Sequence, residues 1–347
     1  MAINSAPAKD LTMFPRVYIF CVALGVAVLV AVTLIPVPPF KANAARISCA
    51  GRQLLFESKQ KQLSMDTPYD VVAFGNSRIL GVGEQELDMP DVHYFNMAVG
   101  GTSFRQSVAM LEMVARQGKA PKVAILSFDH VSLIYAQLPY EYPLPPERWR
   151  LLAGDLGGLF SGPYVVGPDW RKFRQRLFVD EPGFLARTLN FYILRDRLLM
   201  WLGDRDTPCG IAWRPDGSRQ SSAVPSADLY GAPVPHPPLY DDRYPLLEHD
   251  LDRLAAIQQA AGTRIVVYES PVYPPFADYA NPRLNPEMSG QRERLFAGCK
   301  ARGLDCHPSP LIPGTAEDGF WPDAVHAPAK PLGRWVAQLV RPYFKSN

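Results

Sequence analysis

The fold is decided by the stretch Val71-Val72-Ala73-Phe74-Gly75-Asn76-Ser77-Arg78. Its apolar half predicts a short buried strand, and the Gly-Asn-Ser that follows predicts a tight turn. Ligands of open α/β sheets bind outside the carboxyl ends of the strands, so this turn would carry the hydroxyl of Ser77 to the place where chemistry usually occurs. A serine at the end of a strand is more often a plain turn residue or a helix cap, and the rest of the chain has to decide between these interpretations.

Strands and helices alternate on both sides of one long interruption. Short apolar stretches predict further strands, and apolar residues at helical spacing predict helices. The predicted strands lie at 93–98, 122–128, 263–268 and 304–307, and the predicted helices at 41–64, 104–117, 246–262, 288–302 and through Trp335 to Val340. This order predicts an α/β fold in which helices flank a parallel sheet, a three-layer arrangement.

The interruption covers residues from about 135 to 240. It is rich in Pro, Tyr and Trp and has only weak periodicity. We interpret it as a long insertion or cap over the sheet, because a segment of this length is more often functional or stabilising than structureless. Within it, Cys209–Ser218 contains a Pro-Asp-Gly turn signal.

An apolar, uncharged stretch at Val17–Val37 predicts one N-terminal transmembrane helix. About 20 helical residues cross a bilayer core of about 30 Å. The alternative is a cleaved signal peptide, for which Ala42-Asn43-Ala44 resembles a cleavage site, but the apolar stretch is longer than such signals usually have. We therefore expect a cytoplasmic tail at 1–16, an anchor at 17–37 and one extracytoplasmic domain at 38–347.

Charge and cysteine content bear on the compartment. More basic residues follow the span than precede it, which runs against export, although large domains translocate largely regardless of charge. Beyond the span lie Cys49, Cys209, Cys299 and Cys306. The last two are either a disulfide of an oxidising compartment or ordinary buried thiols. We expect a single-pass protein of the inner membrane with its domain in the periplasm.

Composition and motifs exclude several classes of protein. The net charge is only +2 and no run of Lys and Arg stands out, so nothing indicates nucleic-acid binding. The histidines and cysteines show no metal-ligand spacing, and phosphate-loop and dinucleotide glycine patterns are absent, so we expect no metal and no cofactor. The Gly-x-Ser-x-Gly elbow of α/β-hydrolases is absent as well.

Three segments bring together residue types that suit covalent catalysis. Ser77 ends the first strand, Gly100-Gly101 ends the second and opens a helix, and Asp323 and His326 lie on one loop near the C-terminus. A serine hydroxyl is a weak nucleophile until a base takes its proton, and histidine titrates in the right range to do so. Asp323 would orient His326, and the backbone N–H groups of Ser77 and Gly101 would stabilise an oxyanion.

These segments resemble the motifs of the SGNH, or GDSL-like, hydrolase family. The Gly-Asp-Ser of its first block corresponds to Gly75-Asn76-Ser77, the Asn and Gly of its second block to Asn96 and Gly101, and its Asp-x-x-His to Asp323 and His326. The resemblance covers residues from about 68 to 130 and from about 246 to 345. It implies a flavodoxin-like sheet, a Ser77 nucleophile with His326 as acid and base, and an oxyanion or substrate site formed by Gly101, Gly100, Asn96, Asn76 and Arg78.

The third block of the family departs from its pattern in this chain. It usually offers an Asn side chain to the oxyanion, whereas the third strand here ends in Asp129-His130. An ionised Asp129 would repel an oxyanion, so either this side chain points away or His130 donates in its place. Such a departure, together with a single N-terminal anchor, looks like the membrane-anchored O-acetyltransferase branch, which resembles the proteins that acetylate alginate and other exported polysaccharides.

The leading hypothesis is therefore a membrane-anchored O-acyltransferase that acetylates an extracytoplasmic glycan. Acyl donors are not normally found outside the cytoplasm, so a multi-span membrane partner would have to deliver the acyl group. Aromatic residues of the insertion are candidates for stacking on sugars, although core packing is their commoner use: Trp149, Tyr164, Trp170, Trp201 and Trp213. An esterase of the same fold and a non-catalytic glycan-binding scaffold are the alternatives.

The candidate site residues also have plainer interpretations. Asp323 and His326 are alternatively a helix cap and a satisfied buried loop, and Gly100-Gly101 is alternatively only a tight turn. Arg78 is expected to be a surface charge, with contact to an anionic sugar as the alternative.

Overall fold

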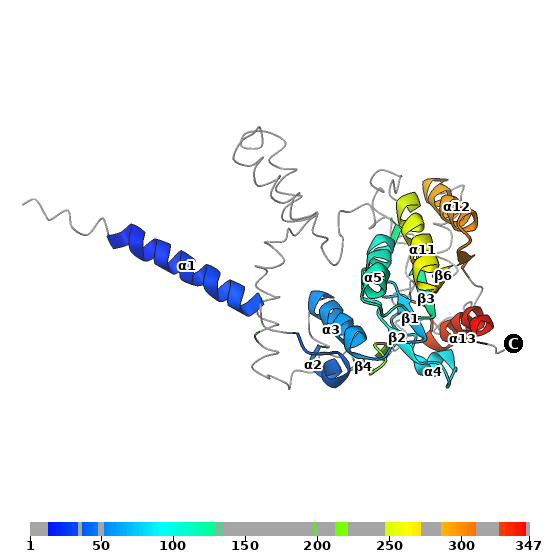
Figure 1. The fold of residues 1–347 in the computed structure, drawn as a ribbon, viewed down its shortest axis with the longest axis horizontal. Coiled ribbons are helices and arrows are strands. Elements are labelled where there is room, and N and C mark those ends of the chain that lie inside the picture. The colour runs from blue at the N-terminus through cyan, green and yellow to red at the C-terminus, as the bar shows by residue number, and fades with distance from the viewer. Residues whose placement is uncertain are drawn as a thin grey trace, which may run out of the picture.

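The computed structural model describes the chain around one parallel β-sheet (Figure 1). The described residues are 13–33, 37–47, 52–129, 132–133, 198, 212–220, 247–271, 286–309 and 326–344. The sheet has five strands in the order β2-β1-β3-β6-β7, and all neighbours are parallel. The strands span Val71–Phe74 (β1), Tyr94–Asn96 (β2), Val123–Phe128 (β3), Arg264–Glu269 (β6) and Asp305–His307 (β7). The predicted α/β fold with a parallel sheet and flanking helices is confirmed.

The central strands are short, apolar and buried on both faces, which is typical of parallel sheets. Every residue of β1 and β3 is buried. Val71 pairs with Tyr94 of β2 on one side and with Val123 of β3 on the other. Because the chain leaves β1 toward one side and returns to β3 on the other, a topological switch point lies between β1 and β3.

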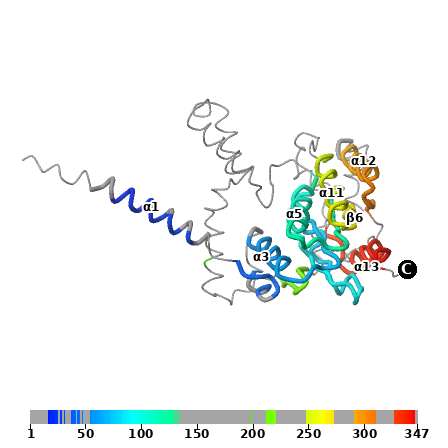
Figure 2. The backbone as a smooth tube through the Cα atoms, in the orientation of Figure 1, coloured from blue at the N-terminus to red at the C-terminus, as the bar shows by residue number. Residues whose placement is uncertain are grey.

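Helices pack on both faces of the sheet. One face carries α3 (Arg52–Met65), α5 (Phe104–Arg116), α11 (Leu247–Ala261) and α12 (Pro286–Ala301), and the other carries α4 (Glu84–Leu87) and α13 (Ala329–Val340). Alternate strand residues supply the two cores, with Val72 and Leu126 in the first and Ala73 and Ile125 in the second. In Figure 2, α5 and α11 lie side by side although they are far apart in the sequence.

The N-terminal part of the described chain is helical. Helix α1 spans Met13–Thr33 and so begins before the predicted span, and the predicted helix at 41–64 is divided into η1 (Lys41–Asn43), α2 (Ala44–Ile47) and α3. Residues 48–51 lie outside the described residues, as does most of the predicted tail. No helix of the described residues meets both the length and the apolar character that crossing a membrane requires.

Of the predicted insertion, the structure describes Leu198 and a hairpin. Its strands β4 (Ala212–Trp213) and β5 (Arg219–Gln220) are antiparallel and enclose the turn that the Pro-Asp-Gly signal predicts. Asp216 closes this turn, because its Oδ1 accepts hydrogen bonds from the backbone N–H of Ser218 at 2.9 Å and from the Ser218 hydroxyl at 2.6 Å. The predicted turn is therefore confirmed.

A disulfide joins Cys299 of α12 to Cys306 of β7. Cys299 is fully buried in the core beneath α12. Of the two interpretations that the sequence leaves open for this pair, the structure has the disulfide. Cys49 and Cys209 lie outside the described residues, and Cys21 on α1 is an exposed free thiol.

Removing this disulfide is expected to destabilise the fold moderately. The two cysteines are 7 residues apart, and the chain-entropy relation gives about 2–3 kcal/mol for a loop this short. We expect Cys299→Ser/Cys306→Ser to lose about that much unfolding free energy in urea titrations, with Cys21→Ser as an unchanged control. Equal stability of the double variant and the oxidised wild type would contradict a stabilising role of the bridge.

Candidate active site

The turn after β1 presents Ser77 at the carboxyl edge of the sheet. Gly75 has a φ of +153°, and a Cβ at this position would collide with the hydroxyl of Ser127 on β3. Only glycine therefore fits at the end of β1. Asn76 closes the turn, since its Oδ1 accepts the backbone N–H of Arg78 at 3.0 Å. Ser77, between Asn76 and Arg78, is partly exposed and lies at the switch point between β1 and β3.

The structure brings Ser77 and His326 into contact across 249 residues of sequence. The Ser77 hydroxyl oxygen lies 2.8 Å from Nε2 of His326, a distance at which a neutral ring nitrogen accepts the hydroxyl proton as a hydrogen bond. This is the contact that a serine nucleophile and its base require. Asp323 lies outside the described residues, so its role stays a prediction.

Helix α13 holds His326 against the turn after β1. His326 lies three residues before the start of this helix, and a Cβ added at Gly81 would come within 3.0 Å of the Cβ of Ala329 in its first turn. Further along α13, Gly333 lies against Glu86 of α4, where an added Cβ would come within 2.6 Å of the Glu86 carbonyl oxygen. The segment that follows the serine and the helix that follows the histidine are therefore in close contact, with small residues at the contact.

Gly100 and Gly101 lie on the loop from β2 to α5, and Gly100 lies next to Ser77. A Cβ on Gly100 would lie 4.0 Å from that of Ser77. Val99 ties this loop to the turn after β1, because its N–H donates to the carbonyl oxygen of Gly75 at 3.1 Å. Within the described residues, the backbone N–H groups of Ser77 and Gly100 donate no hydrogen bond. These two groups are therefore the candidate donors to an oxyanion, and Gly100 takes the role that the sequence predicts for Gly101.

Arg78 is buried, which corrects the expectation of a surface charge. Its side chain is 5% exposed, and its Nε lies 3.0 Å from Oδ2 of Asp129, whose side chain is 2% exposed. The same oxygen accepts a hydrogen bond from Nδ2 of Asn76 at 2.6 Å, and Oδ1 accepts the backbone N–H of Ser132 at 2.9 Å. The Asp129 carboxylate therefore binds the residues on either side of Ser77.

This arrangement accounts for the aspartate at the end of the third strand. Both carboxylate oxygens of Asp129 have partners within the protein, and the guanidinium of Arg78 balances its charge. His130, the other candidate donor at this strand end, lies outside the described residues. The structure thus gives Asn76 and Arg78 a supporting position at the Ser77 turn. One guanidinium nitrogen of Arg78, Nη1, is buried and has no hydrogen-bond partner among the described residues.

Asn96 supports the same segment from the end of β2. It is fully buried, and its Nδ2 donates to the carbonyl oxygens of Ile79 and Val82, each at 2.8 Å. Its Oδ1 accepts the backbone N–H of Ala98 at 2.9 Å. Because these contacts are internal, the geometry gives Asn96 the task of holding the segment after Ser77.

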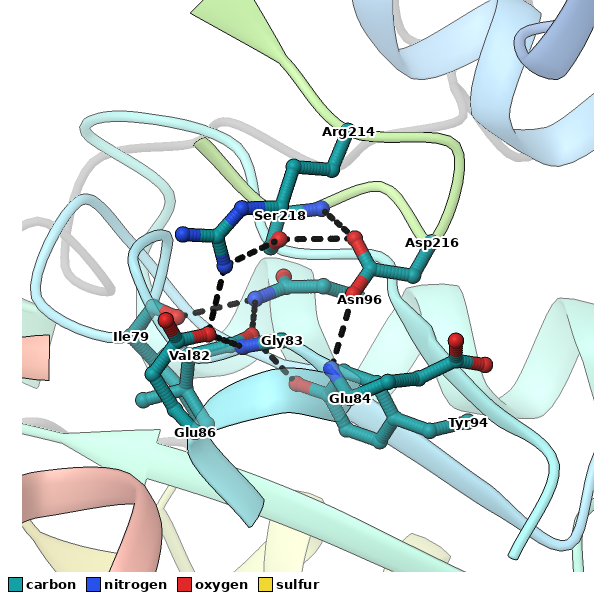
Figure 3. Close-up of polar contacts among 10 residues, drawn as sticks. All are labelled: Ile79, Val82, Gly83, Glu84, Glu86, Tyr94, Asn96, Arg214, Asp216 and Ser218. Carbon is teal, nitrogen blue, oxygen red and sulfur yellow. Dashed lines mark hydrogen bonds and ion pairs between the residues drawn. The ribbon is translucent and has the colours of Figure 1, made fainter. Parts of the chain in front are cut away.

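The β4–β5 hairpin contacts the end of the segment that follows Ser77, at Glu84 and Glu86 (Figure 3). The backbone N–H of Glu84 donates to Oδ2 of Asp216 at 2.8 Å. Beside it, the guanidinium of Arg214 forms an ion pair with the carboxylate of Glu86. The Pro-Asp-Gly signal predicts the turn but carries no information about what the hairpin packs on, so this clamp is not visible in the sequence.

Lys59 of α3 is a fully buried residue that the sequence does not single out. Its ammonium donates to the carbonyl oxygens of Ala98 at 2.7 Å and Gly217 at 2.8 Å. It also lies over the ring of Trp213, 4.7 Å from the centroid, so this candidate for sugar stacking covers a buried lysine. Burial lowers the pKa of the Lys59 ammonium well below its usual value, and the charge of Asp216 opposes that shift.

The contact between Ser77 and His326 therefore defines the candidate site. Comparison with known proteins finds no protein family model and no curated protein that matches the chain. Among the described residues, no group of three or more His, Cys, Asp or Glu side chains is arranged to hold a metal ion.

Proposed function

We propose that the chain is a serine acyltransferase in which Ser77 is the nucleophile and His326 is the general acid and base. The observation that carries this proposal is the 2.8 Å contact between the Ser77 hydroxyl and Nε2 of His326. The position of this contact at the switch point between β1 and β3 supports the proposal, because open parallel sheets bind ligands at their switch point. Asp323 would complete the group by orienting His326.

The proposed reaction has two halves that share an acyl-serine intermediate. In the first, Nε2 of His326 takes the hydroxyl proton while the Ser77 oxygen attacks the carbonyl carbon of the acyl donor. The N–H groups of Ser77 and Gly100 stabilise the oxyanion, and the leaving group departs with the proton from His326. In the second, an acceptor hydroxyl gives its proton to His326 and attacks the acyl carbon. The new ester then leaves, and the proton returns to Ser77.

The proposal includes membership of the SGNH hydrolase superfamily, in its membrane-anchored O-acetyltransferase-like branch. The strand order β2-β1-β3-β6-β7 supports it, because this is the 2-1-3-4-5 order of flavodoxin-like sheets. The placement of Ser77 after the first strand and of His326 before the last long helix also supports it. The departure of Asp129 from the family pattern is compatible with this chemistry, because its charge is paired with Arg78.

We further propose a location and partners that this chemistry requires. The apolar segment at 17–37 would anchor the chain in the inner membrane, with the domain at 38–347 and its insertion at about 135–240 in the periplasm. The Cys299–Cys306 disulfide supports an oxidising compartment. The acceptor would be an extracytoplasmic glycan, and a multi-span membrane protein would pass the acyl group across the membrane.

Intact-mass analysis of the full chain after incubation with an activated acetyl ester tests the proposal. We expect the wild type to gain an acetyl group on Ser77, Ser77→Ala to gain none, and Ser64→Ala, which alters an exposed serine of α3, to behave as wild type. Release of the acetyl group to a glycan hydroxyl supports a transferase, and release to water alone supports an esterase. A folded wild type that gains no acetyl group would favour a glycan-binding scaffold.

A further inference from the structure

The loop from β2 to α5 and the β4–β5 hairpin both contact the buried ammonium group of Lys59. The carbonyl oxygen of Ala98 accepts from Lys59 Nζ at 2.7 Å, and Ala98 stands two residues before Gly100, the glycine that lies against Ser77. The carbonyl oxygen of Gly217 accepts from the same nitrogen at 2.8 Å. The two acceptors are 39 and 158 residues from Lys59 in the sequence, so only the folded chain brings them together.

The second acceptor belongs to the hairpin that holds the Ser77 segment. Gly217 follows Asp216, whose carboxylate accepts the backbone N–H of Glu84 at 2.8 Å. On the same hairpin, the backbone N–H of Arg219 donates to the carbonyl oxygen of Leu80 at 2.6 Å, three residues after Ser77. A displacement of the hairpin would therefore release the segment that follows the serine.

The surroundings of Lys59 suit an ammonium group. Its nitrogen donates to two carbonyl oxygens and lies over the rings of Trp213 and Phe40, with the centroids at 4.7 Å and 5.5 Å. An apolar side chain at this position would leave both buried carbonyl oxygens without their donor. The site thus requires a residue that donates in two directions from inside the core.

We propose that Lys59 is a positioning residue of the active site, which fixes the Gly100 loop and the β4–β5 hairpin relative to each other and thereby places Ser77 against its oxyanion donors. This inference rests on the proposed function of Ser77. It also means that the β4–β5 hairpin, which belongs to the insertion, helps to hold the active site in place.

The test compares Lys59→Met with Lys119→Met in the full chain. Lys119 is a matched control, because its ammonium also donates to a backbone carbonyl oxygen, that of Asp66 at 2.7 Å, but it precedes β3 at the opposite edge of the sheet from Ser77. In folded Lys59→Met we expect the maximal rate of Ser77 acetylation to fall roughly 10- to 100-fold, since small misplacements of reacting groups have effects of this size. The ester concentration that gives half of that rate should stay unchanged, and Lys59→Arg should recover part of the loss.

Amide hydrogen exchange provides a second readout that does not depend on catalysis. We expect faster exchange at 97–103 and 212–220 in Lys59→Met and wild-type exchange there in Lys119→Met. A folded Lys59→Met that exchanges or acetylates like wild type would overturn the inference. If Lys59→Met does not fold, Lys59→Gln, which keeps one donor group on a shorter chain, decides by the same measurements. If the wild type is not acetylated, the proposed function fails, while the exchange data still decide whether Lys59 holds the two loops.

Discussion

Replacing His326 with glutamine is expected to slow acetylation of Ser77 by roughly 100- to 10,000-fold, the usual contribution of a general base. Glutamine occupies similar space and can still form a hydrogen bond, but it does not take up the hydroxyl proton near neutral pH. The rate is measured from the growth of the acetylated mass with an activated acetyl ester. Any adduct that does form should persist longer than in the wild type, because its removal requires the same base.

The matched control for this prediction is His307→Gln. His307 lies on β7 and is half-buried, and its ring meets the ring of Trp335 of α13 with 6.5 Å between the ring centroids. It is therefore a second histidine in contact with α13. We expect this variant to acetylate at the wild-type rate. Wild-type acetylation of His326→Gln would contradict the assignment of His326 as the base.

Replacing Arg78 with methionine is expected to lower the free energy of unfolding by about 3–5 kcal/mol, the usual cost of breaking a buried ion pair. The Asp129 carboxylate, 2% exposed, would lose the cation that lies 3.0 Å away and would be left without an ionic partner in the core. Methionine retains an unbranched apolar chain, so the loss of packing is small. Urea titration of the full chain measures the change.

Two further variants make this test selective. Adding Asp129→Asn to Arg78→Met removes the unpaired charge, so the double variant should recover part of the lost stability. Arg116→Met is the control for an exposed ion pair, because Arg116 is 74% exposed where it meets Glu112, and its expected effect is below about 1 kcal/mol. If Arg78→Met were as mild as Arg116→Met, the buried pair would not be what stabilises the Ser77 turn.

The sheet and the long helices are predictable because periodicity reports burial directly. The apolar stretch at 263–268 predicts β6, observed at Arg264–Glu269, and the spacing over 246–262 predicts α11, observed at Leu247–Ala261. Helix α4, at Glu84–Leu87, is a single turn and has too few residues to show a period. Its place in the fold comes from its contact with α13, which no local pattern contains.

In the candidate site, too, some residues can be predicted from the sequence and others cannot. Ser77 and His326 can be selected from the sequence because few residue types perform this chemistry and each stands beside a recognisable element. The buried positions of Arg78 and Lys59 cannot be predicted from the sequence, because a charged residue is expected at the surface unless its partner is known. Asp129, the partner of Arg78, and Gly217, a partner of Lys59, are distant in sequence and meet these residues only in the folded chain.

The separation of 249 positions between Ser77 and His326 also matters while the chain is being made. At about 5–20 residues per second, a ribosome needs roughly 12 to 50 s to proceed from one to the other. During that interval the growing polypeptide carries Ser77 without its proposed base, so the hydroxyl would have only the ordinary reactivity of a serine toward acyl compounds. Under the proposed mechanism, the serine acquires its base only when α13 has been synthesised and has packed against α4, so activation of the hydroxyl would be one of the last events of biosynthesis.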